Sequence, residues 1–384
     1  MNTNLSQVSV PPIVDFRSRV KNRITKAPQV FDLTQAVPPF PVAPKIVSHL
    51  REALADPSLG QYTDPNGLSE LREAIAEKHV LGQLGPDQVL ITAGGNNALY
   101  LALTLLFSPG EKVALLEPYY FNHEMAVRIL GLNSTVFALD PERGFPLDAA
   151  KLIPFLQASG AKGVVLVTPN NPTGCCYRSQ EILTLVEWAS AHGVEVVIDE
   201  TYGDFDPDHL RDPRLRNFLG KGLSLVGSFS KTMALAGYRI GYFIGSEYQT
   251  QEALKIQDTA LICAPHVSQE AALFGIRNCA VEFLAVRNAL SRQQQLLQSK
   301  RGLFRHFCIS GLGPYFAFVR HPFESLGATD ATLKWFEETG ILGLPGSFFG
   351  TAQESYVRIA YSNISERDLE EALDRWLKFD RSLS

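Results

Sequence analysis

Short apolar segments alternate with amphipathic ones between residues 88 and 245, and this alternation constrains the fold more than any other feature of the sequence. The apolar segments are rich in β-branched residues and predict buried strands at 89–92, 112–116, 164–168, 194–199, 223–228 and 240–244. Helical patterns lie between several of them, at 97–107, 121–130 and 179–192. Strands that alternate with helices predict the α/β class, with a mainly parallel sheet covered by helices on both faces.

The C-terminal part of the chain has a different pattern. A long helical segment at 265–300 is followed by a strand at 315–320, a helix at 329–339, a strand at 356–360 and a helix at 366–378. This order predicts a smaller α+β domain. The chain up to about residue 44 is rich in proline and lacks periodicity, which predicts an extended arm. We therefore expect a large α/β domain at 46–285, with the arm (1–45) and residues 286–384 forming the second unit.

Composition narrows the class of protein. The 384 residues carry a formal net charge of −5, and 20% are charged against 45% hydrophobic, which excludes a disordered, collagenous or coiled-coil chain and disfavours nucleic-acid binding. No apolar run approaches the roughly 20 residues that span a bilayer, and the N-terminus lacks the features of a secretory signal. Five cysteines without a CxxC pair, and histidines without ligand spacing, predict neither a metal site nor a disulfide framework. We expect a cytoplasmic protein that binds neither membrane nor nucleic acid.

Two charged residues stand at the ends of predicted strands. Lys231 comes shortly after the strand at 223–228. A lysine in apolar surroundings loses solvation when charged, so its pKa falls and its amine becomes nucleophilic. Asp199 ends an apolar strand, where a carboxylate is costly to bury without a cationic or hydrogen-bonding partner. Taken alone, Lys231 also fits a surface lysine at the end of a strand.

Two loops at other strand ends offer groups that bind a ligand. Gly94 and Gly95 follow the strand at 89–92 and open a helix, and glycines in such a turn let backbone N–H groups close around a phosphate. Asn170 and Asn171 follow the strand at 164–168 and offer two amides that can donate to a ligand oxygen. Taken alone, the glycine pair also fits an ordinary turn.

Together these segments resemble the fold type I pyridoxal-phosphate (PLP) enzymes, specifically the class I/II aminotransferases related to aspartate aminotransferase. The resemblance runs from about residue 31 to the C-terminus, with the motifs in the family's order and spacing. It implies the PLP-dependent transferase fold, in which a large domain has a mainly parallel, seven-stranded type of sheet and a smaller domain is α+β. It also implies pyridoxal 5'-phosphate as cofactor and the transfer of an amino group from an L-amino acid to a 2-oxo acid.

The resemblance implies a role for each matching residue. Lys231 would form the Schiff base with the cofactor, Asp199 would pair with the protonated ring nitrogen, and both would be catalytic together with Tyr202. Tyr202 and Asn171 would donate to the oxygen on the ring. The residues that would hold the cofactor's phosphate are Gly94, Gly95, Asn96, Ser228, Ser230 and, through paired charge-assisted hydrogen bonds, Arg239.

Three further residues match binding positions of the family. Tyr120 stands where an aromatic ring stacks on the cofactor, although a core tyrosine also fits this position. Tyr62 matches a tyrosine that reaches the cofactor phosphate of the neighbouring subunit, which implies a homodimer with shared active sites. Arg358 stands where the family grips the substrate's α-carboxylate in a planar fork; a structural ion pair is the alternative.

The sequence departs from the family pattern around the substrate. Ala36 stands where the family commonly has a glycine that approaches the substrate, so we expect a tighter pocket floor, with Ala36 and Asn171 joining Arg358 in substrate binding. The segment 262–269 lacks the arginine that dicarboxylate-specific members use, which disfavours aspartate as substrate. The segment 313–316, expected near the pocket rim, is compatible with an apolar or aromatic substrate side chain.

Two other functions stay open at this point. The same residues serve PLP enzymes that do not transaminate, namely β-eliminating lyases and oxidases or cyclases that act on an amino acid, because orientation selects the bond that breaks. Aminotransferase-like domains also act as ligand sensors in transcription regulators. Those carry an additional N-terminal DNA-binding domain, for which the roughly 30 residues before the match are too few.

Overall fold

The computed structural model describes residues 3–21 and 23–383, and at its centre lies a seven-stranded sheet in the order β2-β8-β7-β6-β5-β3-β4. Strand β8 runs antiparallel to both of its neighbours, and the other strands run parallel to one another. Their bounds are β2 (Val89–Thr92), β3 (Lys112–Glu117), β4 (Asn133–Ala138), β5 (Gly163–Val167), β6 (Glu195–Asp199), β7 (Leu223–Ser228) and β8 (Gly241–Ile244). The predicted α/β class and mainly parallel sheet are confirmed.

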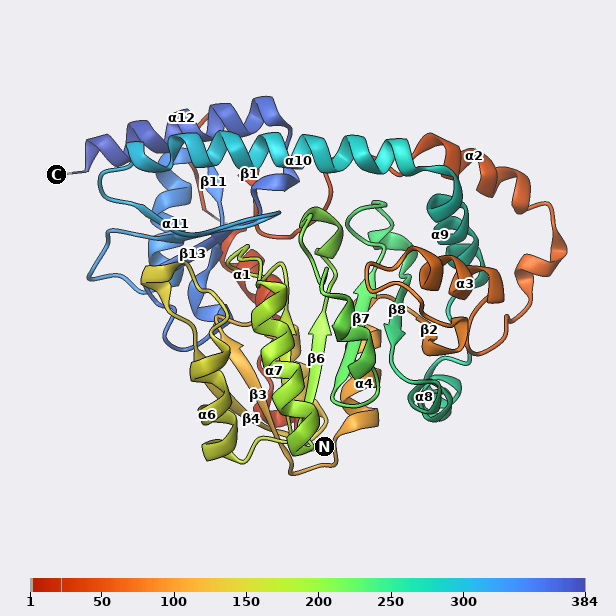
Figure 1. The fold of residues 1–384 in the computed structure, drawn as a ribbon. Helices are drawn as coiled ribbons and strands as arrows, with labels where there is room; N and C mark the ends of the chain where they lie inside the picture. Colours follow the sequence, from red (N-terminus) through yellow and green to blue (C-terminus); the bar gives the residue numbers. More distant parts are fainter. Residues whose placement is uncertain (1–2, 22, 384) are drawn as a thin grey trace.

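Helices cover this sheet on both faces (Figure 1) because its central strands are apolar on both sides. Val197 of β6 packs in one core, and its neighbours Val196 and Ile198 pack in the other, as the alternation of strand side chains requires. The first core includes α4 (Gly95–Leu106), α5 (Phe121–Ile129) and α8 (Glu247–Ala260). The second core includes α2 (Pro44–Ala53), α3 (Ser69–Lys78), α6 (Ala149–Ser159), α7 (Ser179–His192) and α9 (His266–Asn278).

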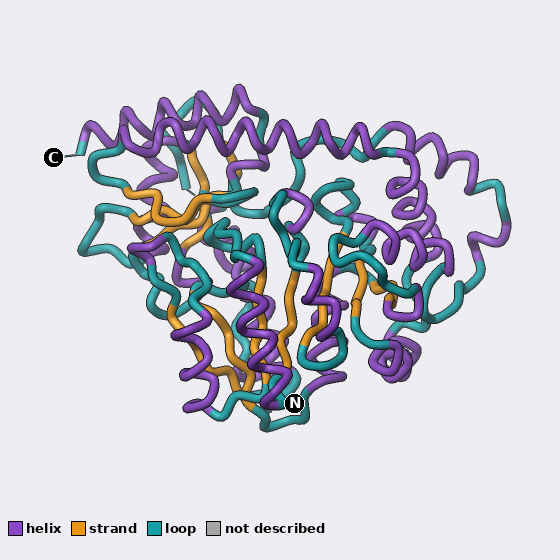
Figure 2. Tube along the Cα trace, in the orientation of Figure 1, coloured by secondary structure: helices purple, strands orange, loops and turns teal. Residues whose placement is uncertain are grey.

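A second, smaller sheet has the order β12-β13-β10-β9 and is antiparallel throughout. Its strands are β9 (Cys308–Leu312), β10 (Ala317–Arg320), β12 (Leu344–Pro345) and β13 (Tyr356–Ile359), and it packs with α11 (Ala328–Thr339) and α12 (Glu366–Ser382). Helix α10 (Ala280–Lys300) extends from α9 to this sheet and lies beside α12, as the two long helices at the top of Figures 1 and 2 show. The predicted α+β pattern of the C-terminal part is confirmed.

The N-terminal segment corrects one expectation. It is not simply an extended arm, because it contains the helix α1 (Pro12–Val20), which begins with a proline at its first position, where the missing N–H costs nothing. Farther along, β1 (Phe31–Asp32) pairs in parallel with β11 (Ile341–Leu342) and thereby joins this segment to the C-terminal part of the chain.

Two further details differ from the predicted elements. The predicted helix at 265–300 is two helices, α9 and α10, which meet at Cys279. The predicted domain boundary at 285–286 falls within α10, and the division into two units stays a prediction. Among the described residues, no helix combines the length and apolar character needed to cross a membrane.

Candidate active site

A cavity of about 370 Å³ lies at the carboxyl ends of the parallel strands. The last residues of β5, β6 and β7, namely Val167, Asp199 and Ser228, all line it. Carboxyl ends of parallel strands meet at one edge of a sheet, so residues far apart in the sequence converge there. The predicted site residues that line the cavity are Ala36, Gly95, Asn96, Tyr120, Asn171, Asp199, Tyr202, Ser228, Ser230, Lys231 and Arg239.

The other three predicted site residues do not line this cavity. Gly94 adjoins it, because a Cβ added there would lie 2.4 Å from Nη2 of Arg239. Arg358 lies behind Asn171 and donates from Nη1 to its Oδ1 at 2.9 Å. Tyr62 is 75% exposed and is not among the residues that line the cavity of its own chain.

One end of the cavity gathers groups that can donate hydrogen bonds. Helix α4 begins at Gly95, so the backbone N–H groups of its first turn are free to donate at this end of the cavity. Gly94, with a φ of +90°, makes the turn into the helix. Arg239 beside them bonds the backbone carbonyls of Ala236 and Ala93, and the described residues place no carboxylate on its guanidinium. The hydroxyl of Ser228 donates to that of Ser230 at 2.7 Å. This donor set fits a phosphate group.

Lys231 supplies the amine of the site. Its Nζ donates to the backbone oxygen of Ala36 and lies 5.7 Å from the ring centroid of Tyr202. Burial, followed by the positive charges of Arg358 and Arg239, lowers the pKa of this amine to about 8, although the negative charge of Asp199 opposes the shift. An amine with this pKa is partly neutral near pH 7, as a nucleophile or proton acceptor must be.

Asp199 is 6% exposed and is held by hydrogen bonds at both oxygens. Its Oδ1 accepts from the backbone N–H of Thr201 at 3.0 Å, and its Oδ2 lies 3.0 Å from Nε2 of the buried His123. His123 was not among the predicted residues, since no spacing marks it and the contact joins residues 76 positions apart. A carboxylate fixed in this way is placed to pair with a cationic ring nitrogen.

Other lining residues also escaped prediction. Pro11 and Ile13 reach the cavity from the start of α1, and Phe121 and Asn122 from the start of α5. The prolines at 11 and 12 were the available signal for the first pair, because proline often opens a helix. The segment 313–316 is not at the rim as expected, because Tyr315 and Phe316 are fully buried and do not line the cavity.

A second cavity, of about 410 Å³, adjoins the first across the loop after β7. Glu200 lines this cavity, whereas its neighbour Asp199 lines the first. The carboxylate of Glu200 is buried and contacts Nε2 of His79 at 2.9 Å, Nε2 of His209 at 3.1 Å and the hydroxyl of Tyr242 at 2.9 Å. Among the described residues, no group of three or more His, Cys, Asp or Glu side chains is arranged to hold a metal ion, here or elsewhere.

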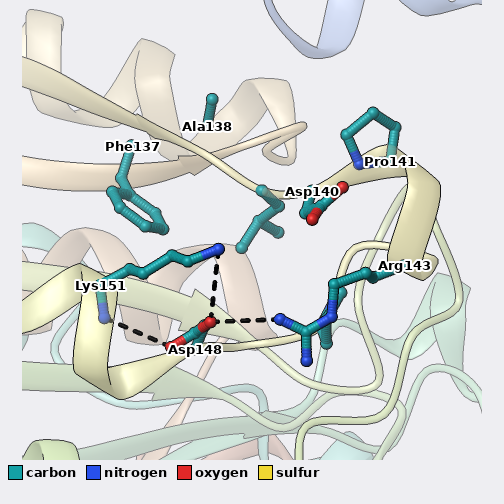
Figure 3. Close-up of a pocket in the computed structure, with 9 residues that line it drawn as sticks. Phe137, Ala138, Asp140, Pro141, Arg143, Asp148 and Lys151 are labelled. Carbon is teal, nitrogen blue, oxygen red and sulfur yellow. Dashed lines mark hydrogen bonds and ion pairs between the residues drawn. The ribbon is translucent and has the colours of Figure 1, made fainter.

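A third pocket lies at the outer edge of the molecule, between the end of β4 and the start of α6 (Figure 3). Asp148 lies between the charged groups of Lys151 and Arg143. Its side chain also accepts a hydrogen bond from the backbone N–H of Lys151, so Asp148 caps the start of helix α6. Asp148, Arg143 and Lys151 therefore pair with one another. The pocket contains none of the predicted site residues.

Comparison with known proteins agrees with this geometry. The model of the family described as aminotransferase class I and II matches residues 28–375. The chain is 27% identical over 370 residues to aromatic-amino-acid aminotransferase 2 of Thermococcus litoralis, with 91% of this chain and 94% of that one covered. It is 26% identical over 385 residues to an aspartate aminotransferase of Thermotoga maritima, with 98% of each covered.

The same likeness appears in three dimensions. A crystal structure of aspartate aminotransferase from Thermotoga maritima superposes with a TM-score of 0.88, covering 100% of both chains at 25% identity. The family match spans far more than half of the chain, and it includes every residue of the cavity except Pro11 and Ile13. The chain belongs to the class I and II aminotransferases, enzymes that use pyridoxal 5'-phosphate as their cofactor.

Proposed function

We propose that this aminotransferase moves the amino group of an L-amino acid with an uncharged side chain to a 2-oxo acid, in the cavity that contains Lys231. The observation that carries the proposal is the position of the Lys231 amine, whose pKa is lowered to about 8, in the same cavity as the carboxylate of Asp199. A reactive amine opposite a buried acid is the arrangement that PLP chemistry needs.

The cavity offers a place for each part of the cofactor. The start of α4 with Arg239, Ser228 and Ser230 would hold the phosphate, and Asp199 would face the ring nitrogen. Asn171 must turn its Oδ1 toward Arg358, which only donates, so its Nδ2 is left to donate into the cavity. Tyr202 and Tyr120 would supply a hydroxyl and a ring surface. When bound, the cofactor supplies an electron sink that makes the Cα proton of an amino acid removable.

Lys231 would hold and move that proton at Nζ. The lowered pKa keeps a fraction of the amine neutral at physiological pH, and the carbonyl of Ala36 orients it. Burial of Tyr202 raises the pKa of its hydroxyl well above the ordinary value, so this group stays a hydrogen-bond donor at all working pH values. Lys231 would therefore carry the proton that moves, and Tyr202 would remain a fixed hydrogen-bond donor.

The substrate would bind with its α-carboxylate at Arg358. Burial lowers the pKa of this guanidinium to about 10, yet it keeps its charge at neutral pH, and its Nε is buried without a hydrogen-bond partner. The cavity offers no further cation to the side chain of the substrate, because Lys231 and Arg239 are the only cations among the described residues that line it. Pro11, Ile13, Val37 and Phe121 offer apolar surface instead, which suits an apolar or aromatic side chain.

We also propose that the enzyme is a homodimer in which Tyr62 of each chain reaches the cofactor site of the other. The support is that Tyr62 is exposed while the turn beside it is firmly held. Gln269, which is fully buried, donates to the hydroxyl of Thr63 at 2.9 Å and accepts from the backbone N–H of Leu68 at 2.7 Å. A rigid turn that presents an aromatic hydroxyl outward is suited to a contact with a second copy.

A panel of L-amino acids tests the proposed reaction. We expect the cognate 2-oxo acid to form only when an amino acceptor such as 2-oxoglutarate is present, with apolar or aromatic donors preferred over aspartate. Ammonia release without an acceptor would contradict transamination and support a lyase or an oxidase. In parallel, Lys231→Ala should lower turnover by about a thousandfold or more, since it removes the general base. Retained turnover in this variant would remove Lys231 from the mechanism.

A further inference from the structure

The environment of Arg358 is unusual for a buried cation. Its side chain is 2% exposed, and the described residues offer it no carboxylate within ion-pairing distance. Nη1 donates to Oδ1 of Asn171 at 2.9 Å, Nη2 donates to the backbone oxygen of Thr34, and Nε has no partner. A buried charge without a counter-ion is costly, so other groups must stabilise the guanidinium and fix its plane.

Two aromatic rings meet this requirement. The guanidinium carbon of Arg358 lies 5.0 Å from the ring centroid of Phe316 and 5.0 Å from that of Phe349. Ring faces attract a cation without neutralising it, whereas a protein carboxylate would compete with the carboxylate of the substrate. The two rings therefore stabilise the guanidinium without supplying a counter-charge of their own.

The two rings are anchored in different parts of the molecule. Phe316 packs edge-on against Tyr202, at 5.1 Å between centroids, and so belongs to the cluster beside the cofactor site. Phe349 belongs to the main core, where it contacts Phe121 of α5 at 5.7 Å. The orientation of Arg358 thus depends on packing from both sides.

The segment that carries Phe349 is tied to the end of β3 in the large sheet. The backbone oxygen of Phe349 accepts from the N–H of Tyr119 at 2.9 Å. Oε1 of Glu117, the last residue of β3, accepts from the N–H of Ala352 at 2.9 Å. Between them, Gly350 has a φ of +144°, and a Cβ there would lie 2.0 Å from Oε1 of Glu117. The close approach requires glycine and holds the segment against the strand.

We propose that Phe316 and Phe349 are positioning residues that hold the guanidinium of Arg358 for a carboxylate ligand, and that Glu117 acts through Phe349 by tying residues 349–352 to β3. This inference rests on the proposed role of Arg358 in binding the substrate's α-carboxylate. It extends the substrate site to three residues that do not line the cavity: Glu117 at the end of β3, Phe316 just before β10, and Phe349 between β12 and β13.

The first experiment compares two inhibitors of the holoenzyme while it transaminates the best donor of the panel. The inhibitor 3-phenylpropionate has a carboxylate and no amine, and 2-phenylethylamine has an amine and no carboxylate. We expect Phe349→Leu and Phe316→Leu to raise the inhibition constant of 3-phenylpropionate by about tenfold, the scale of one desolvated cation–π contact, and to leave that of 2-phenylethylamine little changed. In the same variants, KM for the amino donor should rise together with the inhibition constant of 3-phenylpropionate, while kcat changes less.

The control is Phe243→Leu, which removes an equally buried ring from β8 in the core on the other face of the sheet. It should lower stability without changing the ratio of the two inhibition constants. If the ring variants at 316 and 349 change that ratio no more than Phe243→Leu does, the positioning role is wrong. If Arg358→Leu itself leaves inhibition by 3-phenylpropionate unchanged, the proposed carboxylate site is wrong instead, so the two failures are distinguishable.

The second experiment tests the connection to β3. Glu117→Gln keeps an acceptor for the N–H of Ala352, and Glu117→Ala removes it. We expect Glu117→Ala to raise the inhibition constant of 3-phenylpropionate by about tenfold, because one lost acceptor in a buried site has an effect of this order. Glu117→Gln should keep this constant near the wild-type value. Equal inhibition constants in Glu117→Ala and the wild type would overturn the role of Glu117.

Discussion

Nε2 of His123 lies 3.0 Å from Oδ2 of Asp199, so a helix on one face of the sheet fixes a carboxylate at the end of a central strand. His123 is on α5, which follows β3, whereas Asp199 ends β6. Both side chains are buried, and the second oxygen of Asp199 is held by the N–H of Thr201. The acid of the site is therefore oriented before any ligand binds.

Replacing His123 should weaken both the fold and the site. His123→Ala leaves the buried Oδ2 of Asp199 without this partner, which costs about 1–3 kcal/mol in unfolding free energy. Urea denaturation measures the loss, and cofactor titration should show weaker binding. The control is His192→Ala, an exposed ring on α7. Equal stability of the two variants would contradict the role of the His123–Asp199 contact.

The amine of Lys231 should titrate near pH 8 in the cofactor-free protein. Burial and the nearby arginines lower its pKa to about 8, so it is protonated below that pH and becomes neutral above it. The rate of acetylation at Lys231, followed by peptide mass spectrometry, should rise with pH to a midpoint near 8. Lys255, whose pKa is raised by its hydrogen bond to Glu252, is the internal control and should react only at higher pH.

The same titration tests the electrostatic link to Arg358. Removing this cation in Arg358→Leu should shift the midpoint of Lys231 upward, because the positive charge of Arg358 lowers the pKa of Lys231. A midpoint for Lys231 near 10 in the wild type, or no shift in the variant, would show that the cavity does not perturb the amine as described.

Arg358 should control substrate affinity far more than cofactor affinity. Arg358→Leu removes a charge-assisted fork and should raise KM for both the amino donor and the 2-oxo acid by about a hundredfold. Arg358→Lys keeps the charge without the fork, so its KM should be intermediate. Steady-state kinetics and cofactor titration give the two affinities. An unchanged substrate constant in Arg358→Leu would place the carboxylate elsewhere.

Glu200 should stabilise the protein most between about pH 5 and 6. Burial alone would raise the pKa of Glu200, but the charge of His79 and hydrogen bonds from His209 and His79 hold it well below its ordinary value. Stability from such a carboxylate is full above its unfolded pKa, about 4.3, and falls as the pH drops toward the folded value. Burial lowers the pKa of His79, but Glu200 outweighs it and the net pKa is raised, so stability from the charged ring is lost as the pH rises through that value.

Glu200→Gln tests this pH dependence. The variant should lose about 3 kcal/mol of unfolding free energy near pH 5.5, as expected for a broken buried pair, and less at both pH 4 and pH 8.5. Urea denaturation at the three pH values measures the difference. Arg320→Gln, which breaks an exposed ion pair with Glu142, is the control and should change little. A difference that does not depend on pH would contradict the charged state of the cluster.

Much of the site was predictable because its residues follow directly after strands. The apolar, β-branched segments marked β6 and β7 closely, and Asp199 and Lys231 come at or just after their ends. Parallel strands bring such ends to one edge, so the order of elements already implied that these residues meet. Gly94 was recognisable for the same reason, as a turn between a strand and a helix.

Other features had no local signal. The edge strand β4 and the helix α1 were missed, since β4 is only partly buried and α1 lies in a proline-rich segment with two buried residues. Nothing near Tyr120 distinguished a stacking ring from a core ring. Phe316 was expected near the pocket rim and Phe349 had no predicted role, because their contact with Arg358 depends on how three separate segments pack.

The order of residues along the chain thus determined the α/β class, the parallel sheet and the strand ends that line the cavity, because hydrophobic periodicity and turn chemistry are local properties. Tertiary structure alone decided which other groups support the site residues. His123 contacts Asp199, the rings of Phe316 and Phe349 contact Arg358, and Glu117 holds the segment beside Phe349. Apart from the contact of Phe349 with Arg358, these contacts join residues tens to hundreds of positions apart. Burial gives them their strength, so they exist only once the chain is packed.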